Sequence, residues 1–373
     1  MGRRAFVSFI TSWDVDCGIA RYSAELVNAL RKHVDIFIIP FGPQVWKRLG
    51  LPNDIAAQKI RAVEAARVAS HAEIAHIQFQ PQFFGGMHPL RCTFTTLVGN
   101  LRVPAVVTIH ELDTYGAFPV SLVKRLINIW LFRRCKAGRF IVHNEFTRGL
   151  LLKLGVNQSK VSVIPMWVPN VKPLKLTKVE ARKLLGLECE RAIGAFGFIV
   201  RRRGYDLLLE ALNPFPDGTV LVIIGGKHPL DRSGYYEEFV RRVSQWRWRE
   251  RVIMTGFVSD DELPTWLSAL DFVVAPFTEL TESASLLRCI AYSLPIVCSD
   301  LKPLRELSER AKCARLFKAG DASSLRAAIL ELLERDDLQR QLAHNAASYA
   351  ATYRVEQAAE LTLRVYIDAL GHS

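Results

Sequence analysis

The sequence lacks an apolar run long enough to cross a membrane. A spanning helix needs roughly 18 to 20 uninterrupted apolar residues, and the nearest candidate, Leu122 to Phe132, is broken by Lys124, Arg125 and Asn128. No small-residue cleavage site follows the short apolar run near the N-terminus, where charge returns by Asp14. We therefore expect a first β-strand there rather than a signal peptide, in a cytoplasmic protein that is soluble or rests on a membrane surface.

The sequence is also poor in motifs that would define other classes of protein. Its seven cysteines are scattered, with no CxxC pair and no Cys/His spacing suited to zinc, which favours reduced, buried thiols. No G-x-G-x-x-G follows a strand with an acid about 20 residues later, so a nicotinamide enzyme is disfavoured. No nucleic-acid reading module is recognisable and the basic residues are dispersed, so nucleic-acid binding is disfavoured as well.

Acidic residues are in deficit. The chain has 37 Asp and Glu against 49 Lys and Arg, which gives a net charge of +12. This balance favours an anionic partner, such as nucleotide phosphates, a phospholipid surface or nucleic acid, and charge alone does not choose among them. A chain of 373 residues with an apolar fraction of 50% is too long for one ordinary core, so two domains of similar size are expected.

Short β-rich runs alternate with helix-period segments along most of the chain. This alternation predicts βα units and an α/β fold with parallel sheets. A Pro- and Lys-rich stretch near residues 168–180 separates two such series, so we predict domains at residues 1–170 and 171–353. Residues 324–370 are predicted to be helical throughout, and residues 354–373 form a C-terminal helix that can pack on the N-terminal domain.

The segment from Val252 to Asp300 is the most informative part of the sequence. It alternates strand and helix patterns, and its polar residues cluster where the strands end. In open parallel sheets, ligands bind outside the carboxyl ends of the strands. The loop from Thr278 to Ser285 is therefore the predicted location of the chemistry.

Several segments together resemble the retaining glycosyltransferases of family 4, which have the GT-B fold. They are CGIARYSAELVNAL, VVTIHELD, FGFIVRRRGYDLLLEAL, VIMTGFVSDDELPTWLSALDFVVAPF and SLLRCIAYSLPIVCSD, which span nearly the whole chain in the order of the family motifs. The resemblance implies two Rossmann-like domains facing a cleft and a nucleotide-diphosphate sugar donor held mostly by the C-terminal domain. It also implies a reaction that needs no metal or other cofactor.

Two candidate residues lie in the N-terminal half. Gly18 stands at a turn that runs into a helix, where backbone amides favour phosphate, although a glycine before a helix can be only a turn. His110 ends a predicted strand, and the resemblance implies that it contacts the donor sugar; the alternative is a histidine satisfied by a backbone carbonyl. His76 lies inside a strand pattern and is interpreted as structural.

The turn RRRG follows the first strand of the second series. Three guanidinium groups there can bind a diphosphate bidentately, or they can be solvated surface. The resemblance puts Arg203 in the position of a family lysine, with help from Arg202 or Arg201, while Phe198 replaces a family arginine. The predicted strand VIMTG is followed by a loop that begins with Phe257 and Val258. The resemblance implies that backbone groups near these two residues meet the nucleotide base. Ser259 is predicted to cap the following helix.

The acidic signature of the family is altered. Alignment places Arg288 where the second family glutamate belongs and Leu280 where the first belongs, flanked by Glu279 and Glu282. We favour Glu282 as the sugar-contacting acid, because small residues with free amides follow it before a helix, as a phosphate-facing turn requires; among them Ser283 and Ser285 are assigned to donor binding. Arg288 cannot accept hydrogen bonds from ribose hydroxyls, so it contacts phosphate or pairs with a carboxylate.

The acceptor is expected to be a glycan or a lipid-linked molecule. Residues 121–139 combine an apolar stripe with six basic residues, which suits either an anionic bilayer or a core-packed helix with a solvated basic end. A second basic and aromatic run, residues 241–251, is interpreted as a surface helix end. The leading prediction is a retaining glycosyltransferase of polysaccharide or glycolipid biosynthesis. The alternative, motivated by Arg288 and Phe198, is a catalytically impaired homologue that binds a nucleotide sugar or polysaccharide.

Overall fold

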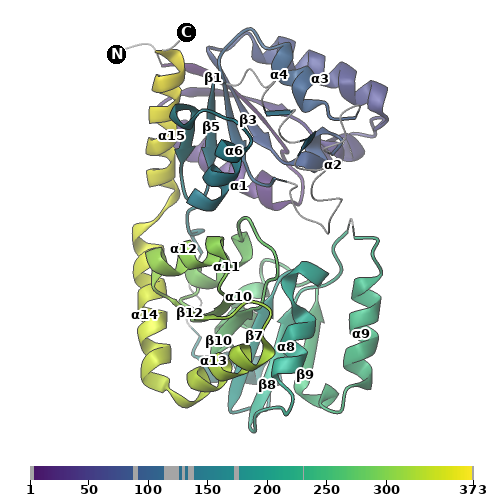
Figure 1. Cartoon of the computed structure of the whole chain (residues 1–373), viewed down its shortest axis with the longest axis vertical. Coiled ribbons are helices and arrows are strands. Elements are labelled where there is room, and N and C mark those ends of the chain that lie inside the picture. The colour runs from purple at the N-terminus through teal and green to yellow at the C-terminus, as the bar shows by residue number, and fades with distance from the viewer. Residues whose placement is uncertain are drawn as a thin grey trace. The chain divides into compact units, whose positions relative to one another are not determined.

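The computed structural model describes residues 4–86, 91–112, 126–127, 131–132, 138–171, 176–229 and 231–371. The chain divides into two compact units (Figure 1). The first unit comprises Met1–Met166 and Val355–Ser373, and the second comprises Trp167–Arg354. Each unit contains a six-stranded sheet whose neighbouring strands all pair in parallel, so the predicted α/β class with two parallel sheets is confirmed.

The first unit has the strand order β2-β1-β3-β4-β5-β6. Its strands are β1 (Phe6–Thr11), β2 (Asp35–Pro40), β3 (Ile74–Phe79), β4 (Ala105–Ile109), β5 (Arg139–Val142) and β6 (Val161–Val163). Its helices are α1 (Gly18–Leu30), α2 (Pro43–Arg48), α3 (Ile55–Ala69), α4 (Phe94–Gly99), α6 (Glu145–Lys153) and α15 (Val355–Leu370), with 3-10 turns η1 (Pro81–Phe84) and η2 (Gln158–Lys160). Because all six strands are parallel, their carboxyl ends lie along one edge of the sheet.

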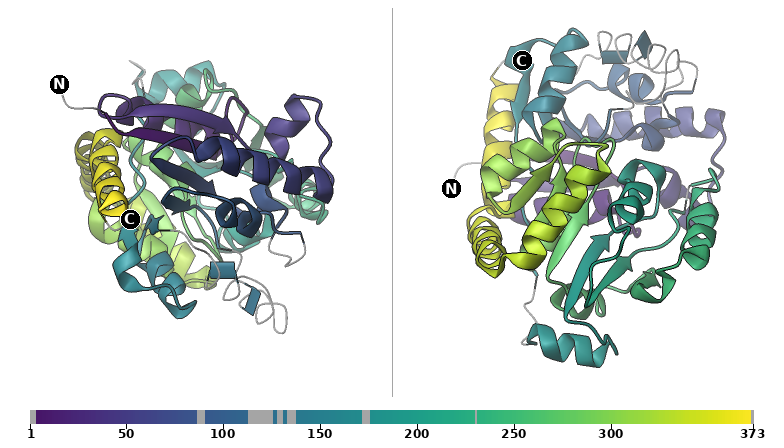
Figure 2. Two further views of the ribbon diagram at one scale, coloured as in Figure 1. Left: turned by 90° about the horizontal axis from the view of Figure 1, so that it is seen from above. Right: turned by 60° about the horizontal axis from the view of Figure 1, so that its bottom comes forward.

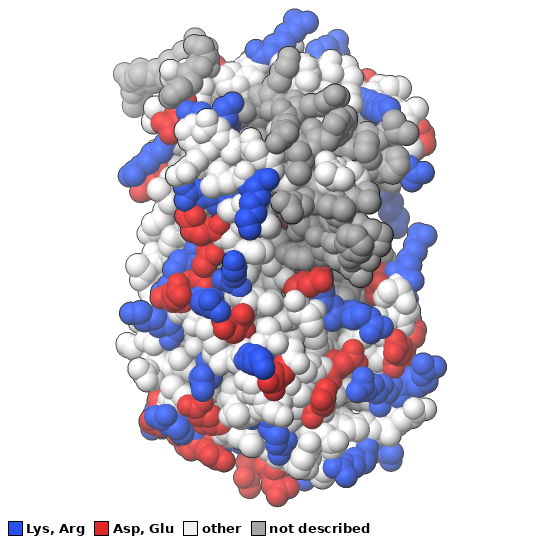
Figure 3. Space-filling model, in the orientation of Figure 1, with Lys and Arg blue, Asp and Glu red and all other residues white. Residues whose placement is uncertain are grey.

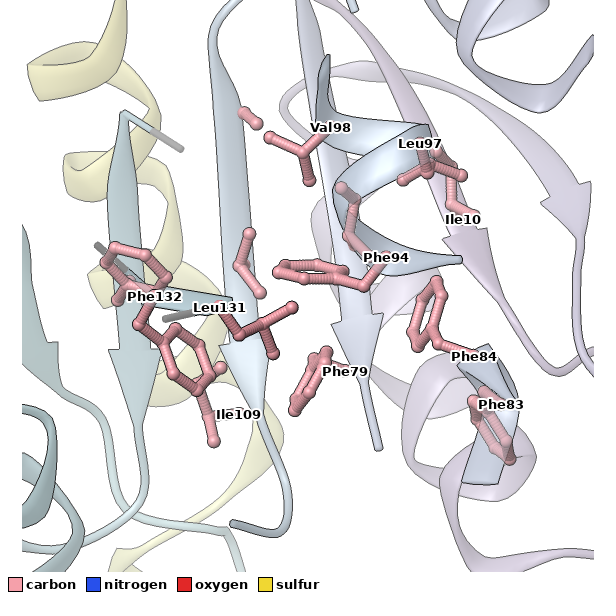
Figure 4. Close-up of a cluster of buried hydrophobic side chains, with 14 of the residues drawn as sticks. Ile10, Phe79, Phe83, Phe84, Phe94, Leu97, Val98, Ile109, Leu131 and Phe132 are labelled. Atoms are coloured by element: carbon pink, nitrogen blue, oxygen red, sulfur yellow. The ribbon is translucent and has the colours of Figure 1, made fainter. Parts of the chain in front are cut away.

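One face of this sheet is covered by a cluster of aromatic side chains (Figure 4). Phe79 at the end of β3 packs edge-on to Phe94 of α4, with ring centroids 4.6 Å apart, and stacks on Phe84 at 5.6 Å. Phe132 completes the group at 5.7 Å from Phe79. Large rings bury much apolar surface, so this cluster fixes the end of β3 beside the edge that carries the candidate residues.

The second unit has the strand order β12-β11-β10-β7-β8-β9. Its strands are β7 (Arg191–Phe196), β8 (Thr219–Ile224), β9 (Val252–Gly256), β10 (Phe272–Ala275), β11 (Ile296–Ser299) and β12 (Ala314–Phe317). Its helices are α7 (Lys178–Leu184), α8 (Tyr205–Ala211), α9 (Tyr235–Gln245), α10 (Leu263–Ser268), α11 (Ala284–Ala291), α12 (Lys302–Ala311), α13 (Ala322–Glu334) and α14 (Asp336–Thr352), with 3-10 turns η3 (Arg201–Arg203) and η4 (Arg249–Arg251). The chain order reverses between β7 and β10, which makes their carboxyl ends the expected ligand site of an open parallel sheet.

The C-terminal region is helical, as predicted, and the break near residue 354 agrees with a separate last helix, whereas the break at Arg335 was not predicted. It forms three helices, because the backbone leaves the helical region at Arg335 (ψ 86°) and at Tyr353 (ψ 87°). No proline or glycine stands at either break, so the usual sequence signal for the end of a helix is missing. The last helix, α15, lies at the yellow end of the chain in Figure 2 and packs against α1, β3 and β4 of the first unit.

A second difference concerns the helix after β9. Ser259 was expected to cap it, but regular helix begins only at Leu263. Ser259 and Glu262 instead close the preceding turn, since the Ser259 hydroxyl donates to the Glu262 carboxylate at 2.7 Å and accepts from the Glu262 amide at 3.3 Å. The capping interaction therefore exists, one turn before the helix that it was predicted to start.

A buried acid ties the strands of the second sheet to α7 at the amino ends of β7 and β10. Asp271 is 3% exposed and accepts hydrogen bonds from Lys178 Nζ at 2.8 Å and Arg182 Nη2 at 2.5 Å. The backbone amide of Ala192 donates to the same carboxylate at 2.7 Å. Arg182 also donates to the carbonyl oxygens of Ala269 and Glu190, both at 2.9 Å, so the donors and acceptors of this ion cluster are matched.

On the face shown in Figure 3, basic and acidic side chains are interspersed over the described residues. The described Lys and Arg side chains therefore do not gather into one patch on that face. Among the described residues, no helix is both long enough and apolar enough to cross a bilayer. Most of the predicted basic helix, residues 121–139, lies outside the described residues.

Candidate active site

The turn η3, which follows β7, packs directly against the loop that follows β10. Gly204 caps α8 in the left-handed conformation, with φ at 71°, and a Cβ placed on it would lie 1.8 Å from the carbonyl oxygen of Pro276. The amide of Thr278 donates to the carbonyl of Arg202 at 2.9 Å. This close approach requires glycine, and it joins the two loops at the point where the strand order reverses.

Replacing Gly204 with alanine is expected to destabilise the second unit. Gly234 provides a matched control, because it also caps a helix with a positive φ of 76° but has no atom within 4 Å of an added Cβ. We expect Gly234→Ala to lower the free energy of unfolding by about 1 kcal/mol, the cost of the left-handed backbone. Gly204→Ala adds overpacking and should cost about 2 to 4 kcal/mol. Urea denaturation measures both, and equal losses would contradict the close packing.

The Arg203 side chain folds back over the end of β7. Its Nη1 donates to the carbonyl of Phe196 at 2.7 Å and to Ser285 Oγ at 3.1 Å, and its guanidinium lies 5.1 Å from the ring centroid of Phe277. Gly197 makes room for it, since a Cβ there would lie 2.3 Å from Nη1. Burial lowers the pKa of Arg203 below its ordinary value, although an arginine remains charged at neutral pH.

No carboxylate among the described residues forms an ion pair with Arg203, whose hydrogen-bond partners are a carbonyl and a hydroxyl. The neighbouring Arg201 differs, because it pairs with Glu238 at 3.3 Å and lies 4.8 Å from the ring centroid of Tyr235. Arg202 is exposed. Arg203 therefore keeps a positive charge that neutral groups hold in place, and such a charge attracts an anion.

Two serines connect Arg203 to the start of α11. Ser283 is the N-cap of this helix and accepts a hydrogen bond from the amide of Leu286, and the hydroxyls of Ser283 and Ser285 lie 3.0 Å apart. The structure thus brings Arg203, Ser283 and Ser285 together, as a phosphate-binding turn requires. The basic residue, the hydroxyls and the helix amides all favour an anionic ligand.

The acids of the same loop lie in different surroundings. Glu279 is exposed, whereas Leu280, in the position of the family glutamate, is buried. Glu282 is partly buried and accepts a hydrogen bond from the Ser283 amide at 3.1 Å. The pKa values of Tyr349 and Tyr353 are raised, first by burial and further by the negative charge of Glu282, so its carboxylate lies near the end of α14.

Arg288 lies one turn after Ser285 in α11 and pairs with a carboxylate, one of the two alternatives that the sequence left open. Its Nη2 donates to Asp260 Oδ1 at 2.7 Å. Asp260 belongs to the loop predicted to meet the base, in which Phe257 is 71% exposed and Val258 is partly buried against an apolar cluster. Sequence reasoning missed Asp260, because nothing in the sequence pairs residues that are 28 positions apart.

In the first unit, Gly18 is the first residue of α1. It is exposed, and an added Cβ would have no atom within 4 Å. Cys17 caps the helix, since its sulfur accepts a hydrogen bond from the amide of Ala20 at 3.3 Å. The backbone of Gly18 therefore does not demand glycine, and the residue leaves the start of the helix open to a ligand.

His110 follows β4 at the carboxyl edge of the first sheet. Its Nε2 lies 2.7 Å from Gln78 Oε1, and its ring packs edge-on to Tyr22, with centroids 4.8 Å apart. Burial, together with the nearby His143 and His76, holds the pKa of His110 well below 6.5. The ring is therefore neutral, and it donates from Nε2 to the amide oxygen. His76 lies inside β3, as its strand pattern predicted, and is fully buried.

Two doubly wound units of this kind define a two-domain Rossmann-like protein, and solved structures share the arrangement. HepE from Anabaena in complex with UDP and glucose has a TM-score of 0.78 and 15% identity, covering 98% of this chain and 100% of that one. Sucrose-phosphate synthase from Thermosynechococcus elongatus has a TM-score of 0.78 and 18% identity, covering 99% and 100%. The fold is GT-B, as the resemblance implied.

Residues 17–170 match the model of "Glycosyltransferase Family 4", and residues 190–335 match that of "Glycosyl transferases group 1". The chain therefore belongs to the group 1 glycosyltransferases of family 4. It is 25% identical over 289 residues to 2-deoxystreptamine glucosyltransferase of Streptomyces kanamyceticus, with 72% of each chain covered. It is 27% identical over 197 residues to the lipopolysaccharide core biosynthesis mannosyltransferase LpsB of Rhizobium meliloti (strain 1021), covering 51% of this chain and 55% of that one.

Proposed function

We propose that the protein transfers a sugar from a nucleotide-diphosphate sugar to a glycan or lipid-linked acceptor, with retention at the anomeric carbon and without a metal ion. The observation that carries the proposal is the charge of Arg203, which forms no ion pair with a carboxylate among the described residues and lies beside two serine hydroxyls and the first turn of α11. The similar HepE structures contain UDP and UDP-glucose, which supports a nucleotide-sugar donor. The relatives that transfer glucose or mannose support a hexose.

In this proposal, the diphosphate is neutralised by the protein alone. Arg203 donates from its guanidinium to the departing phosphate, with Ser283, Ser285 and the α11 amides around it, and the exposed Arg202 and the α1 start at Gly18 assist. A fixed cation at the leaving group does the work that a metal does in other transferases.

The sugar is held by His110 and by an acid of the β10–α11 loop. His110 is neutral, so it exchanges hydrogen bonds with sugar hydroxyls without adding charge. Glu282 is the favoured acid, because its hydrogen bond to the Ser283 amide already holds it at the start of α11, while Glu279 is exposed. Backbone groups near Phe257 and Val258 meet the base.

A donor screen tests this function. Purified protein is incubated with UDP-, GDP- and ADP-sugars and a panel of glycan and lipid-linked acceptors, with and without EDTA, and release of the nucleoside diphosphate is measured together with formation of the glycoside. We expect turnover with at least one donor, at a rate that EDTA does not change. The NMR coupling constant of the anomeric proton in the product should indicate the same anomeric configuration as in the donor. Turnover that EDTA abolishes contradicts metal independence, and an inverted product contradicts retention.

A second function is favoured by one observation. Arg288 occupies the position of a family glutamate and is already paired with Asp260, so the acidic pair of the family is incomplete. A protein of this kind could bind a nucleotide sugar or polysaccharide without turning it over. Tight donor binding by calorimetry, without transfer or hydrolysis across the whole panel, would select this alternative.

Association with an anionic membrane also stays a proposal. Its motivation is the basic segment 121–139, most of which lies outside the described residues. If the segment rests on a bilayer, charge reversal at Arg133, Arg134 and Lys136 should reduce cosedimentation with anionic vesicles. Unchanged sedimentation would count against a membrane-bound acceptor site on this segment.

A further inference from the structure

Behind His110, a line of buried polar side chains runs through the first unit. Gln78 and His76 point from β3, Thr108 from β4 and Tyr366 from α15, and none is more than 2% exposed. Gln78 Nε2 lies 3.1 Å from His76 Nε2, and His76 Nδ1 lies 2.6 Å from the Tyr366 hydroxyl. Thr108 Oγ1 lies 2.8 Å from the same Nε2 nitrogen of His76.

The directions of these hydrogen bonds are linked. A glutamine amide accepts at one end and donates at the other. Its oxygen accepts from His110 Nε2, so its nitrogen donates to His76 Nε2. Burial lowers the pKa of His76 to about 3, so this ring is neutral and carries its single proton on Nδ1, from which it donates to Tyr366. The donor and acceptor of each hydrogen bond therefore determine the donor and acceptor of the next one in the line.

Packing alone does not account for this line. Apolar side chains of similar size fill a core without the cost of burying polar groups, whereas a fully satisfied polar network specifies one arrangement of its members. One end of this network is the histidine at the carboxyl edge of the sheet. The other end is a helix that the chain adds to this unit only after completing the second one.

We propose that Gln78, His76 and Tyr366 are positioning residues, which hold the His110 ring in place with its proton on Nε2, so that Nδ1 is presented as an acceptor to a hydroxyl of the donor sugar. The part of this inference that concerns the sugar rests on the proposed function. Helix α15 then helps to orient His110, because Tyr366 is linked to it through the side chains of His76 and Gln78. No other side-chain hydrogen bond of His110 is present among the described residues.

Two variants break the line at different points. Gln78→Met removes the direct partner of His110, and Tyr366→Phe removes one hydroxyl at the far end. Thr362→Val is the matched control, because Thr362 is equally buried in α15 but its hydroxyl donates to Ala358 of the same helix. The proton position on His110 is measured by 15N NMR of histidine-labelled protein, since protonated and unprotonated ring nitrogens resonate apart.

We expect wild-type protein and Thr362→Val to show His110 with a single proton position on Nε2. Gln78→Met and Tyr366→Phe should show a mixture of both positions. Their kcat should fall about fivefold, the effect of one neutral hydrogen bond, while the Kd for UDP, measured by calorimetry, stays unchanged.

The outcomes separate this inference from the proposed function. An unaltered His110 spectrum in both variants would contradict the proposed positioning role. A kcat for Tyr366→Phe that equals that of Thr362→Val would contradict it as well. If no donor is turned over by the wild-type protein, the proposed function fails, while the spectra still decide whether the line sets the proton on His110.

Discussion

Replacing Arg203 with alanine is expected to lower kcat/KM for sugar transfer by about 100- to 1,000-fold, the range for loss of one preorganised donor at a developing anion. The reason is geometric. The guanidinium is already held by the Phe196 carbonyl and the Ser285 hydroxyl, so it needs little reorganisation when the diphosphate departs. Initial rates with the donor found in the screen measure the effect.

The same turn supplies the control. Arg201 is 70% exposed and paired with Glu238, so Arg201→Ala should change kcat/KM by less than about twofold. Arg203→Lys keeps the charge but loses the planar fork and should retain more activity than the alanine variant. A loss below about tenfold in Arg203→Ala would show that the leaving group is stabilised elsewhere. The melting temperatures of all three variants show whether they are folded.

Much of the fold could be predicted because strands of parallel sheets are buried on both faces and give continuous apolar runs. The strand β12 was missed, since it has only four residues, pairs with one neighbour and is partly exposed. The break at Arg335 was missed for another reason. No proline or glycine stands there, and Asp336 and Asp337, which suit the first turn of a new helix, are only a weak signal for the break.

The candidate site also contains some residues that could be predicted from the sequence and others that could not. Arg203, Ser283 and Ser285 could be predicted because each lies at a strand end or a helix start, where local sequence fixes the backbone. Partners far apart in sequence could not, and His76 and Tyr366 are 290 residues apart. A weak signal existed, because β3 carries two polar residues, His76 and Gln78, within a strand whose other residues are all apolar. Such residues must find buried partners.

Asp271→Ala is expected to lower the free energy of unfolding by about 3 to 5 kcal/mol, the cost of leaving a buried charge without its partner. The variant strands Arg182, whose side chain is 11% exposed, and the amide of Ala192 loses its acceptor as well. Urea denaturation, followed by the fluorescence of tryptophans in the second unit, measures the change.

Asp336→Ala is the comparison for that variant. Asp336 is 55% exposed and pairs with Arg191 at 2.7 Å, so its loss should change stability far less, because water replaces the partner. The Asp271 cluster lies at the amino ends of β7 and β10, whereas Arg203 and the serines follow their carboxyl ends. Folded Asp271→Ala protein should therefore bind UDP with the Kd of the wild type. A weakened Kd below the unfolding transition would mean that the acid also sets the position of the Arg203 turn.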